Sequence, residues 1–325
     1  MFYKNIYIRL FTLIIAIVLL HKYAPTPLKY PNTKMSNNIS DKYHGKEIED
    51  EYRWLEDETS SQTEAWIQKQ NAFTNRYIRK ISFRKKIEKR LTDLWNYPTI
   101  SLPFKKGKKV YFYKNNGLQN QSILYAKNRI EDADSSAKVI IDPNNFSKNG
   151  GTSLSGIYFS NDNKYLGYAI SNSGSDWREF FIKDLSTGKN LSDHLEWIKF
   201  SGMSWAESGF YYNAFPKPTD GRELSDINQS SKVFFHKLGT SQSDDSLIFS
   251  DLTNPKISNY PSTTNDGRFL IIYRTKGTYG NALLVKDLNN ADSEFVSIVD
   301  DFTSEIDIID NIGGKLIAIT DRNAA

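Results

Sequence analysis

A polar turn followed by a strongly apolar strand recurs five times between residue 105 and the end of the sequence. The copies are KKGKKVYFY, SNDNKYLGYAIS, AESGFYYNAF, TNDGRFLIIYR and NIGGKLIAIT, and their turn residues are Gly107, Asn163, Gly209, Gly267 and Gly314. Successive turn residues are 46 to 58 positions apart. A period near 50 residues with several strands in each unit is typical of a β-propeller. The regular period argues against the alternative, a plain antiparallel sandwich.

The repeat also predicts where each strand lies in a blade. Glycine and asparagine tolerate positive φ, so we expect each turn to join the two middle strands of a four-stranded blade. A second apolar element follows each of the first four turns, and we expect it to be the outer strand. A blade cannot bury both faces by itself, so each blade must pack on its neighbours. We therefore predict a mainly β chain, with a partial propeller of about four to five blades over residues 98–325.

Two helices are predicted ahead of the repeats, within residues 41–97. Ser61 and Glu64 have the spacing of a capping box at the start of the first helix. The first helix has an aromatic stripe made of Trp66, Phe73 and Tyr77. The second helix has an apolar stripe made of Phe83, Ile87, Leu91 and Leu94. Both stripes predict packing against a neighbouring domain.

The first 24 residues predict export. Lys4 and Arg9 precede an apolar run at residues 10–20, which has the length of a signal-peptide core and is short for a span of about 20 residues. Lys22 stands where a small residue is expected before cleavage after Ala24, so an uncleaved membrane anchor is the alternative. We expect an exported protein, periplasmic or anchored in an inner membrane. Residues 25–40 are expected to form a flexible leader.

Composition excludes several classes of function. The net charge is +4, from 42 basic and 38 acidic residues, which is too balanced to imply a nucleic-acid partner. The chain has no cysteine, which excludes disulfides, thiol catalysis and thiolate metal sites. Its four histidines, His21, His44, His194 and His236, show no metal-binding spacing, and no glycine-rich phosphate loop precedes a helix. We expect neither a metal nor a cofactor.

Several strings in the sequence resemble the prolyl oligopeptidase family of serine peptidases. They are YHG at residues 43–45, YRWLED at residues 52–57, SGSDW at residues 173–177 and KFSGMSW at residues 199–205. The resemblance implies a seven-bladed propeller that caps a separate peptidase domain. It also implies that residues 41–97 pack with that domain, which is absent from this chain.

The resemblance implies two substrate contacts. Phe200 matches a family phenylalanine that packs against the peptide, and Arg274 matches a family arginine that reaches the peptide backbone. A guanidinium offers several donors to a peptide carbonyl, and an aromatic ring suits a proline or an apolar side chain. The alternative is that Phe200 is a core aromatic residue and Arg274 an ordinary charge at a strand end.

No catalytic residue is predicted. Peptidases of this kind place their nucleophile in a Gly-x-Ser-x-Gly elbow, and none of the 18 glycines begins that pattern. The sequence therefore predicts the N-terminal and propeller portion of a serine endopeptidase that cleaves short proline-containing peptides. It would be a fragment, a truncated gene product, or a partner that needs the remainder supplied. The alternatives are a non-catalytic propeller that binds a peptide or protein, and, less favoured, a sugar-acting or lyase propeller.

Overall fold

The structure is a computed structural model that describes residues 28–36, 39–57 and 59–324. It divides into two compact units, residues 1–85 and residues 86–325. The predicted signal peptide or anchor at residues 1–24 lies outside the described residues. None of the described helices is long and apolar enough to cross a membrane.

The first unit is a hairpin followed by helices. Its elements are β1 (Ser40–Tyr43), β2 (Lys46–Glu49), the 3-10 helix η1 (Arg53–Glu56) and α2 (Ser61–Ile78). Ser60, not Ser61, caps α2, because its side-chain oxygen accepts the backbone N–H of Thr63 at 3.1 Å. The cap lies one position earlier than predicted, and Thr63 rather than Glu64 stands three positions after it, so the predicted capping box does not form.

Part of the predicted leader contacts this unit. The indole N–H of Trp66 donates to Thr33 Oγ1 at 2.9 Å, and the indole N–H of Trp54 donates to the Lys34 carbonyl at 2.9 Å. The ring of Tyr30 lies 5.0 Å from that of Phe73. These contacts fix residues 30–34 against the aromatic stripe of α2, where we had expected a flexible segment.

Helix α3 (Arg84–Trp95) spans the boundary between the two units, which falls after residue 85. Its predicted apolar stripe is present and exposed. Exposed fractions are 60% for Phe83, 50% for Ile87, 48% for Leu91 and 49% for Leu94.

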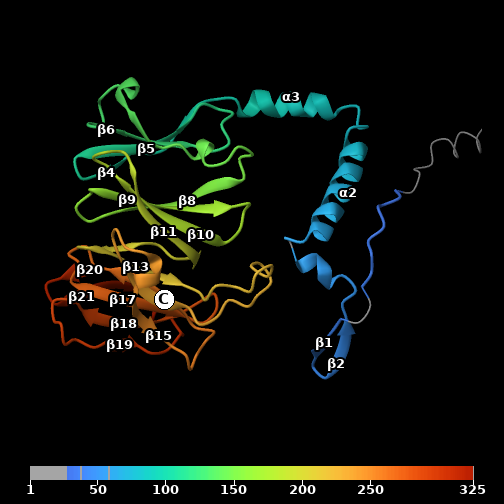
Figure 1. The fold of residues 1–325 in the computed structure, drawn as a ribbon. Helices are drawn as coiled ribbons and strands as arrows, with labels where there is room; N and C mark the ends of the chain where they lie inside the picture. Colours follow the sequence, from blue (N-terminus) through green and yellow to red (C-terminus); the bar gives the residue numbers. More distant parts are fainter. Residues whose placement is uncertain (1–27, 37–38, 58, 325) are drawn as a thin grey trace, which may run out of the picture. The chain divides into compact units, whose positions relative to one another are not determined.

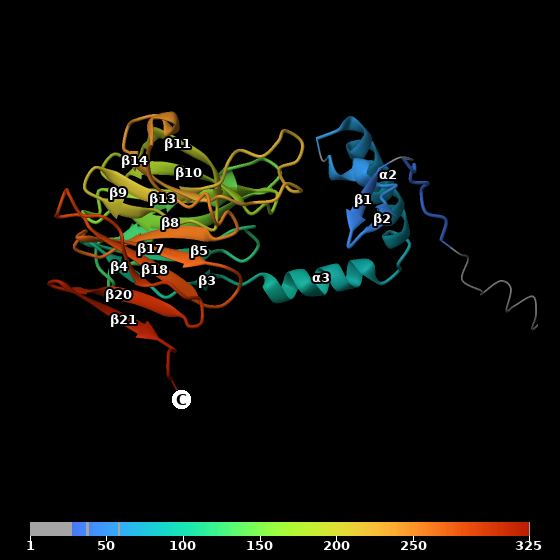
Figure 2. The same cartoon turned by 90° about the horizontal axis from the view of Figure 1, so that it is seen from below.

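The second unit contains four larger antiparallel sheets and a two-stranded sheet (Figures 1 and 2), so the predicted partial propeller is confirmed. Blade 1 consists of β3 (Thr99–Ile100), β4 (Phe104–Lys106), β5 (Lys109–Asn115), β6 (Ile123–Lys127) and β7 (Lys138–Ile141). Blade 2 consists of β8 (Thr152–Phe159), β9 (Tyr165–Asn172), β10 (Trp177–Asp184) and β11 (Asn190–Lys199).

The later blades repeat this order. Blade 3 consists of β12 (Ser204–Ala206), β13 (Gly209–Ala214), β14 (Lys232–Lys237) and β15 (Ser246–Ser250). Blade 4 consists of β16 (Ser258–Thr263), β17 (Phe269–Thr275), β18 (Asn281–Asp287) and β19 (Val296–Val299). The two-stranded sheet consists of β20 (Ile306–Ile312) and β21 (Lys315–Thr320).

The cores lie between consecutive blades rather than inside them. Leu124 of blade 1 and Leu166 of blade 2 belong to one buried cluster, and both are fully buried. Phe180 of blade 2 and Phe210 of blade 3 belong to a second buried cluster. In a third cluster, blade 4 packs against β20 and β21. Each sheet therefore depends on the next for burial, as expected for a repeat architecture.

One detail of the predicted blade is wrong. In blades 2 to 4 the repeated turn joins the first and second strands, not the two middle strands, and the second apolar element is the third strand. In blade 1 the turn joins β4 and β5, and the second apolar element is β6. The outer strands β7, β11, β15 and β19 follow after it. Sequence patterning missed them because they share no common pattern: β7 and β15 each hold three consecutive apolar residues, whereas polar residues interrupt β11 and β19.

Candidate functional site

The two predicted substrate contacts lie at the same end of the blades. Since neighbouring strands are antiparallel, the connections between them alternate between two ends of each sheet. Phe200 lies in the β11–β12 connection, and Arg274 is the next-to-last residue of β17. The β9–β10 turn, the β13–β14 loop and the β17–β18 turn belong to this end, which we call the Phe200 end. Among the described residues, Phe200 and Arg274 share no contact partner.

Phe200 is held in an unusual position. Its φ is +55°, a left-handed conformation that is uncommon for a bulky residue, and 56% of its surface is exposed. Its neighbour Ser201 is buried and accepts the backbone N–H of Asn213 at 3.0 Å. The fixed neighbour and the exposed ring argue against a core role for Phe200. Strained residues of this kind occur often at binding sites.

An aromatic cluster lies beside Phe200. The rings of Trp177 and Trp197 meet edge to face at 5.5 Å, and Trp177 meets Phe215 at 6.3 Å. The Lys199 ammonium lies 4.3 Å from the Trp177 ring centroid, and burial lowers the pKa of this lysine. Trp197 also has a positive φ, of +60°. The cluster gives this end rigid apolar surface with a cation in contact, a chemistry suited to apolar peptide side chains.

Part of the Arg274 guanidinium group contacts residues of the propeller itself. It forms an ion pair with Asp251, and its Nε donates to Asn259 Oδ1 at 3.3 Å. Its side chain is 18% exposed and that of Asp251 is 13% exposed. Burial alone would raise the pKa of Asp251, but hydrogen bonds from Thr253 and Asn254 and the charge of Arg274 lower it below the ordinary value. Arg274 is therefore more than an ordinary surface charge.

The β13–β14 loop, residues 215–231, connects the surroundings of both residues. The indole N–H of Trp177 donates to the Glu223 carbonyl of this loop at 2.6 Å. At the far end of the loop, the Asn259 amide donates to the Ser231 carbonyl at 3.0 Å. Asn259 in turn accepts from Arg274. The loop thus links the aromatic cluster to the arginine through hydrogen bonds.

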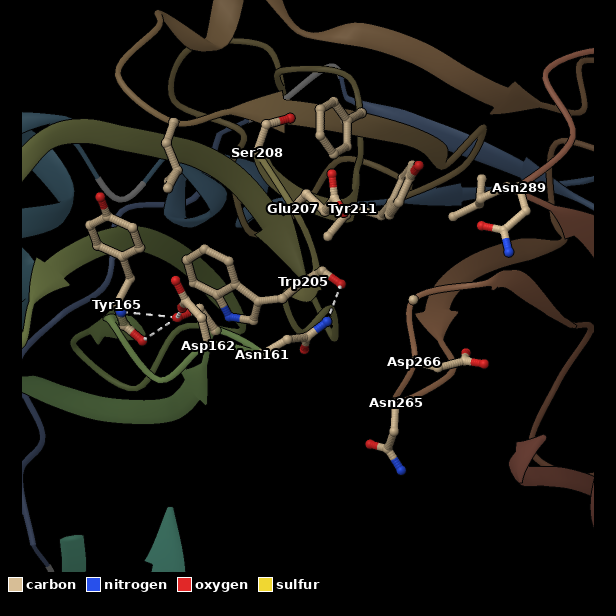
Figure 3. A pocket seen from close by; sticks show the side chains of 16 residues that line it. Asn161, Asp162, Tyr165, Trp205, Glu207, Ser208, Tyr211, Asn265, Asp266 and Asn289 are labelled. Carbon is tan, nitrogen blue, oxygen red and sulfur yellow. Dashed lines mark hydrogen bonds between the residues drawn. The ribbon is translucent and has the colours of Figure 1, made fainter. Parts of the chain in front are cut away.

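A cavity of about 670 Å³ lies at the opposite end, among the first turns of blades 2, 3 and 4 (Figure 3). Its walls include Trp205 and Tyr211, and two acids, Asp162 and Asp266. These acids are occupied by turn hydrogen bonds: Asp162 accepts from Ser160 at 2.7 Å and Asp266 from Thr264 at 2.7 Å. The hydrogen bond from Ser160 lowers the pKa of Asp162. The pKa of Asp266 is lowered mainly by a hydrogen bond from Asn311 of β20, with further hydrogen bonds from the Arg268 backbone N–H and from Thr264. We interpret the acids as parts of the blade turns.

Three histidines fall within the described residues, and none of them hydrogen-bonds a serine hydroxyl. His44 is exposed in the β1–β2 turn. His194 contacts Glu179, and His236 is fully buried between Asp193 and Asp245. The His236 arrangement could not be predicted from sequence, because its two acids are separated from it by 43 and 9 positions.

Comparisons with known proteins settle the family. Residues 31–325 match the family model described as prolyl oligopeptidase, N-terminal beta-propeller domain. The chain belongs to the prolyl oligopeptidase family. The sequence resemblance is thereby confirmed.

Relatives in this family are longer proteins. The chain is 45% identical over 300 residues to the prolyl endopeptidase of Elizabethkingia miricola, covering 91% of this chain and 41% of that protein. It is 32% identical to prolyl oligopeptidase A of Amanita bisporigera, covering 92% of this chain and 44% of that protein. The chain therefore spans about two fifths of the length of the curated relatives that it matches.

A solved structure shows the same fold. Prolyl oligopeptidase B from Galerina marginata, bound to a 35mer hydrolysis and macrocyclization substrate, superposes with a TM-score of 0.76 at 26% identity. The match covers 93% of this chain and 45% of that one. The roles of Phe200 and Arg274 remain predictions.

Proposed function

We propose that this chain is the propeller portion of an endopeptidase that cleaves short proline-containing peptides. The family match over residues 31–325 is the observation that supports this proposal most strongly. The chain provides blades and a peptide-contacting end, while the catalytic serine, aspartate and histidine belong to a peptidase domain that pairs with it. The exposed stripe of α3 offers an apolar surface on which that domain packs.

Phe200 and Arg274 are the proposed peptide contacts. The exposed ring of Phe200 stacks on a proline or apolar side chain. Arg274 keeps its ion pair with Asp251 and uses remaining guanidinium donors on a peptide carbonyl, since the group has five N–H donors. The hydrogen-bonded β13–β14 loop holds the surroundings of both residues in place.

A chimaeric enzyme tests this proposal. Residues 31–325 replace the matching region of the Elizabethkingia miricola prolyl endopeptidase, which is 45% identical. We expect the chimaera to cleave a chromogenic prolyl peptide. Phe200→Ala should raise KM about tenfold with little change in kcat, because a binding contact outside the reacting atoms is lost.

Ile312→Ala is the matched control, since this isoleucine is 73% exposed and is the last residue of β20, at the opposite end. A folded chimaera without activity, or equal KM values for Phe200→Ala and Ile312→Ala, would contradict the proposed role.

We also propose that the chain is exported. Lys4 and Arg9 ahead of the apolar run at residues 10–20 support this. Fractionation of an expressing bacterium, with mass spectrometry of the N-terminus, would show whether the leader is cleaved or retained as an anchor. Recovery of the intact chain only in the cytoplasm would contradict export.

A further inference from the structure

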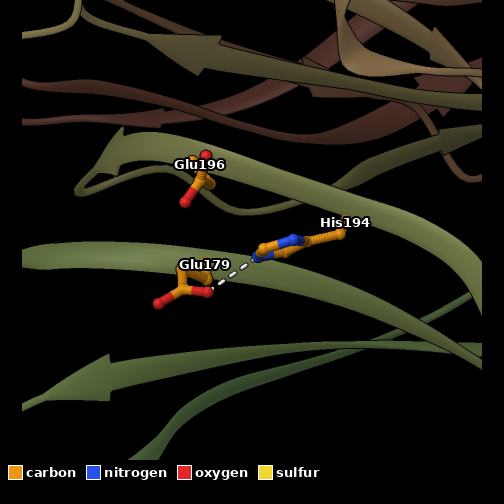
Figure 4. A group of neighbouring side chains, drawn as sticks. All are labelled: Glu179, His194 and Glu196. Atoms are coloured by element: carbon orange, nitrogen blue, oxygen red, sulfur yellow. Dashed lines mark hydrogen bonds and ion pairs between the residues drawn. The ribbon is translucent and has the colours of Figure 1, made fainter.

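We propose that Glu179, His194 and Glu196 form a zinc-binding site on blade 2. Figure 4 shows the three side chains together on β10 and β11. One ligand atom from each lies within 4.8 Å of the others. Nothing in the proposed peptidase function uses these residues.

The local sheet geometry brings the three residues together. In the β10–β11 pair, Phe181 faces His194, and the register shifts between Arg178 and Phe180. Glu179 lies two positions before Phe181 on β10, so it points to the face of the sheet that carries His194. The two β11 residues are two positions apart, so they point to the same face of the sheet.

Each ligand is positioned by other contacts. The His194 ring stacks on Phe181, with centroids 4.6 Å apart and planes 12° apart. Asn172 Nδ2 donates to Glu179 Oε1 at 2.8 Å, which leaves Oε2 directed at His194. The Gln242 side chain fixes the backbone of residue 196, with contacts of 3.0 Å to both its N–H and its carbonyl. Outer contacts that orient ligands in this way are common around metal ions.

The charge at this place favours a cation. Two carboxylates lie close together, and among the described residues the ion pair of Glu179 is with His194 rather than with lysine or arginine. The Glu196 carboxylate has no hydrogen-bond partner among the described residues. Like charges at this separation repel each other, and a divalent cation between them would remove that cost.

The ligand set favours zinc over magnesium or calcium. Imidazole with carboxylates suits Zn²⁺, whereas Mg²⁺ and Ca²⁺ take oxygen ligands only. His194 Nε2 lies 2.7 Å from Glu179 Oε2. Two ligands of a tetrahedral zinc with bonds of about 2.0 Å are about 3.3 Å apart. A small movement of His194 away from Glu179 therefore makes room for the zinc ion in place of the proton that the two side chains share. The exposed side chain of Glu196 rotates to complete the set, and water takes the fourth position.

Calorimetric titration of the full chain with Zn²⁺ tests this site. We expect one ion to bind per chain, with His194→Ala and Glu196→Gln each weakening binding at least about tenfold. His44→Ala and Glu207→Gln are the matched controls, because both residues are exposed and lie outside the cluster, and they should bind zinc like the wild type.

Several results would overturn the site. They are the lack of saturable zinc binding, equal binding by His194→Ala and wild type, and Ca²⁺ binding as tight as Zn²⁺ binding. Circular dichroism without metal checks that the variants fold. If His194→Ala fails this check, Glu196→Gln decides the question, because its side chain is exposed and isosteric replacement leaves the backbone contacts of residue 196 unchanged.

Discussion

At the scale of single residues, Arg274 has both a structural and a proposed binding role. Its ion pair with Asp251 is mostly buried, and the same guanidinium contacts Asn259. A buried ion pair that loses one partner leaves an uncompensated charge, which is costly. The sequence predicted Arg274 as a peptide contact but did not predict its ion pair with Asp251. That acid lies 23 positions away, in a turn with no distinctive sequence motif.

Replacing Arg274 should therefore reduce stability as well as peptide binding. We expect Arg274→Met to lower the free energy of unfolding by about 3 kcal/mol, because Asp251 stays buried without its partner. Arg222→Met is the control, since its ion pair with Asp226 is more exposed and its loss should lower the free energy of unfolding less. Urea unfolding followed by circular dichroism measures both, and equal losses would argue against a buried pair.

His236 should make stability depend on pH. Burial would lower the pKa of this histidine, but hydrogen bonds with Asp245 and Asp193 outweigh it and raise the pKa above 6.5. A raised pKa in the folded state contributes stability that is fully present below pH 6.5 and is lost as the pH rises through the folded value. Urea unfolding between pH 6 and pH 9 should show this loss in the wild type. His236→Gln should lack it, and an unchanged pH slope in the variant would refute the assignment.

At the scale of elements, the sequence predicted what a strong local pattern specifies. The repeated turns and the second apolar elements correspond to strands such as β9 and β10. The short first strand β12 and the outer strands did not stand out, because their burial comes from neighbouring sheets rather than from their own pattern. The sequence also could not show the register of β10 on β11, which brings Glu179 next to His194.

Close packing of the β17–β18 turn gives a test at this scale. Gly280 and Gly174 both have φ of +75°, but a Cβ at Gly280 would lie 2.0 Å from the Phe302 carbonyl oxygen, whereas nothing lies within 4 Å of one at Gly174. Gly174→Ala should cost about 1–2 kcal/mol, the backbone penalty alone. Gly280→Ala should cost about 1–3 kcal/mol more, since the backbone of residue 302 must move. Equal unfolding free energies for the two variants would show that the turn relaxes freely.

At the scale of the whole molecule, each sheet buries its apolar side chains by packing against an adjacent sheet. The two-stranded sheet uses one face, including Ile308 and Leu316, against blade 4. Its other face leaves Ile317 41% exposed and Ile319 65% exposed. Such a surface favours association of the chain, since exposed apolar strands at a sheet edge promote pairing.

The exposed face should cause self-association of the purified chain. Replacing Ile317 and Ile319 together with lysine should shift the sedimentation profile toward the monomer, because charge on a strand face opposes pairing. A control variant adds two lysines elsewhere, at the exposed positions Ser135 and Ala291, and should associate like the wild type. Equal effects of both variants would attribute the association to net charge rather than to this face.

The most direct test asks whether the catalytic residues lie outside this chain. It measures cleavage of a chromogenic prolyl peptide in parallel for the purified chain and for the chimaera with the Elizabethkingia miricola peptidase region. The chain alone should release no product above buffer, while the chimaera should turn over and respond to Phe200→Ala through KM. Turnover by the chain alone, resistant to further purification and abolished by a serine-directed inhibitor, would contradict the view that the catalytic residues lie outside it.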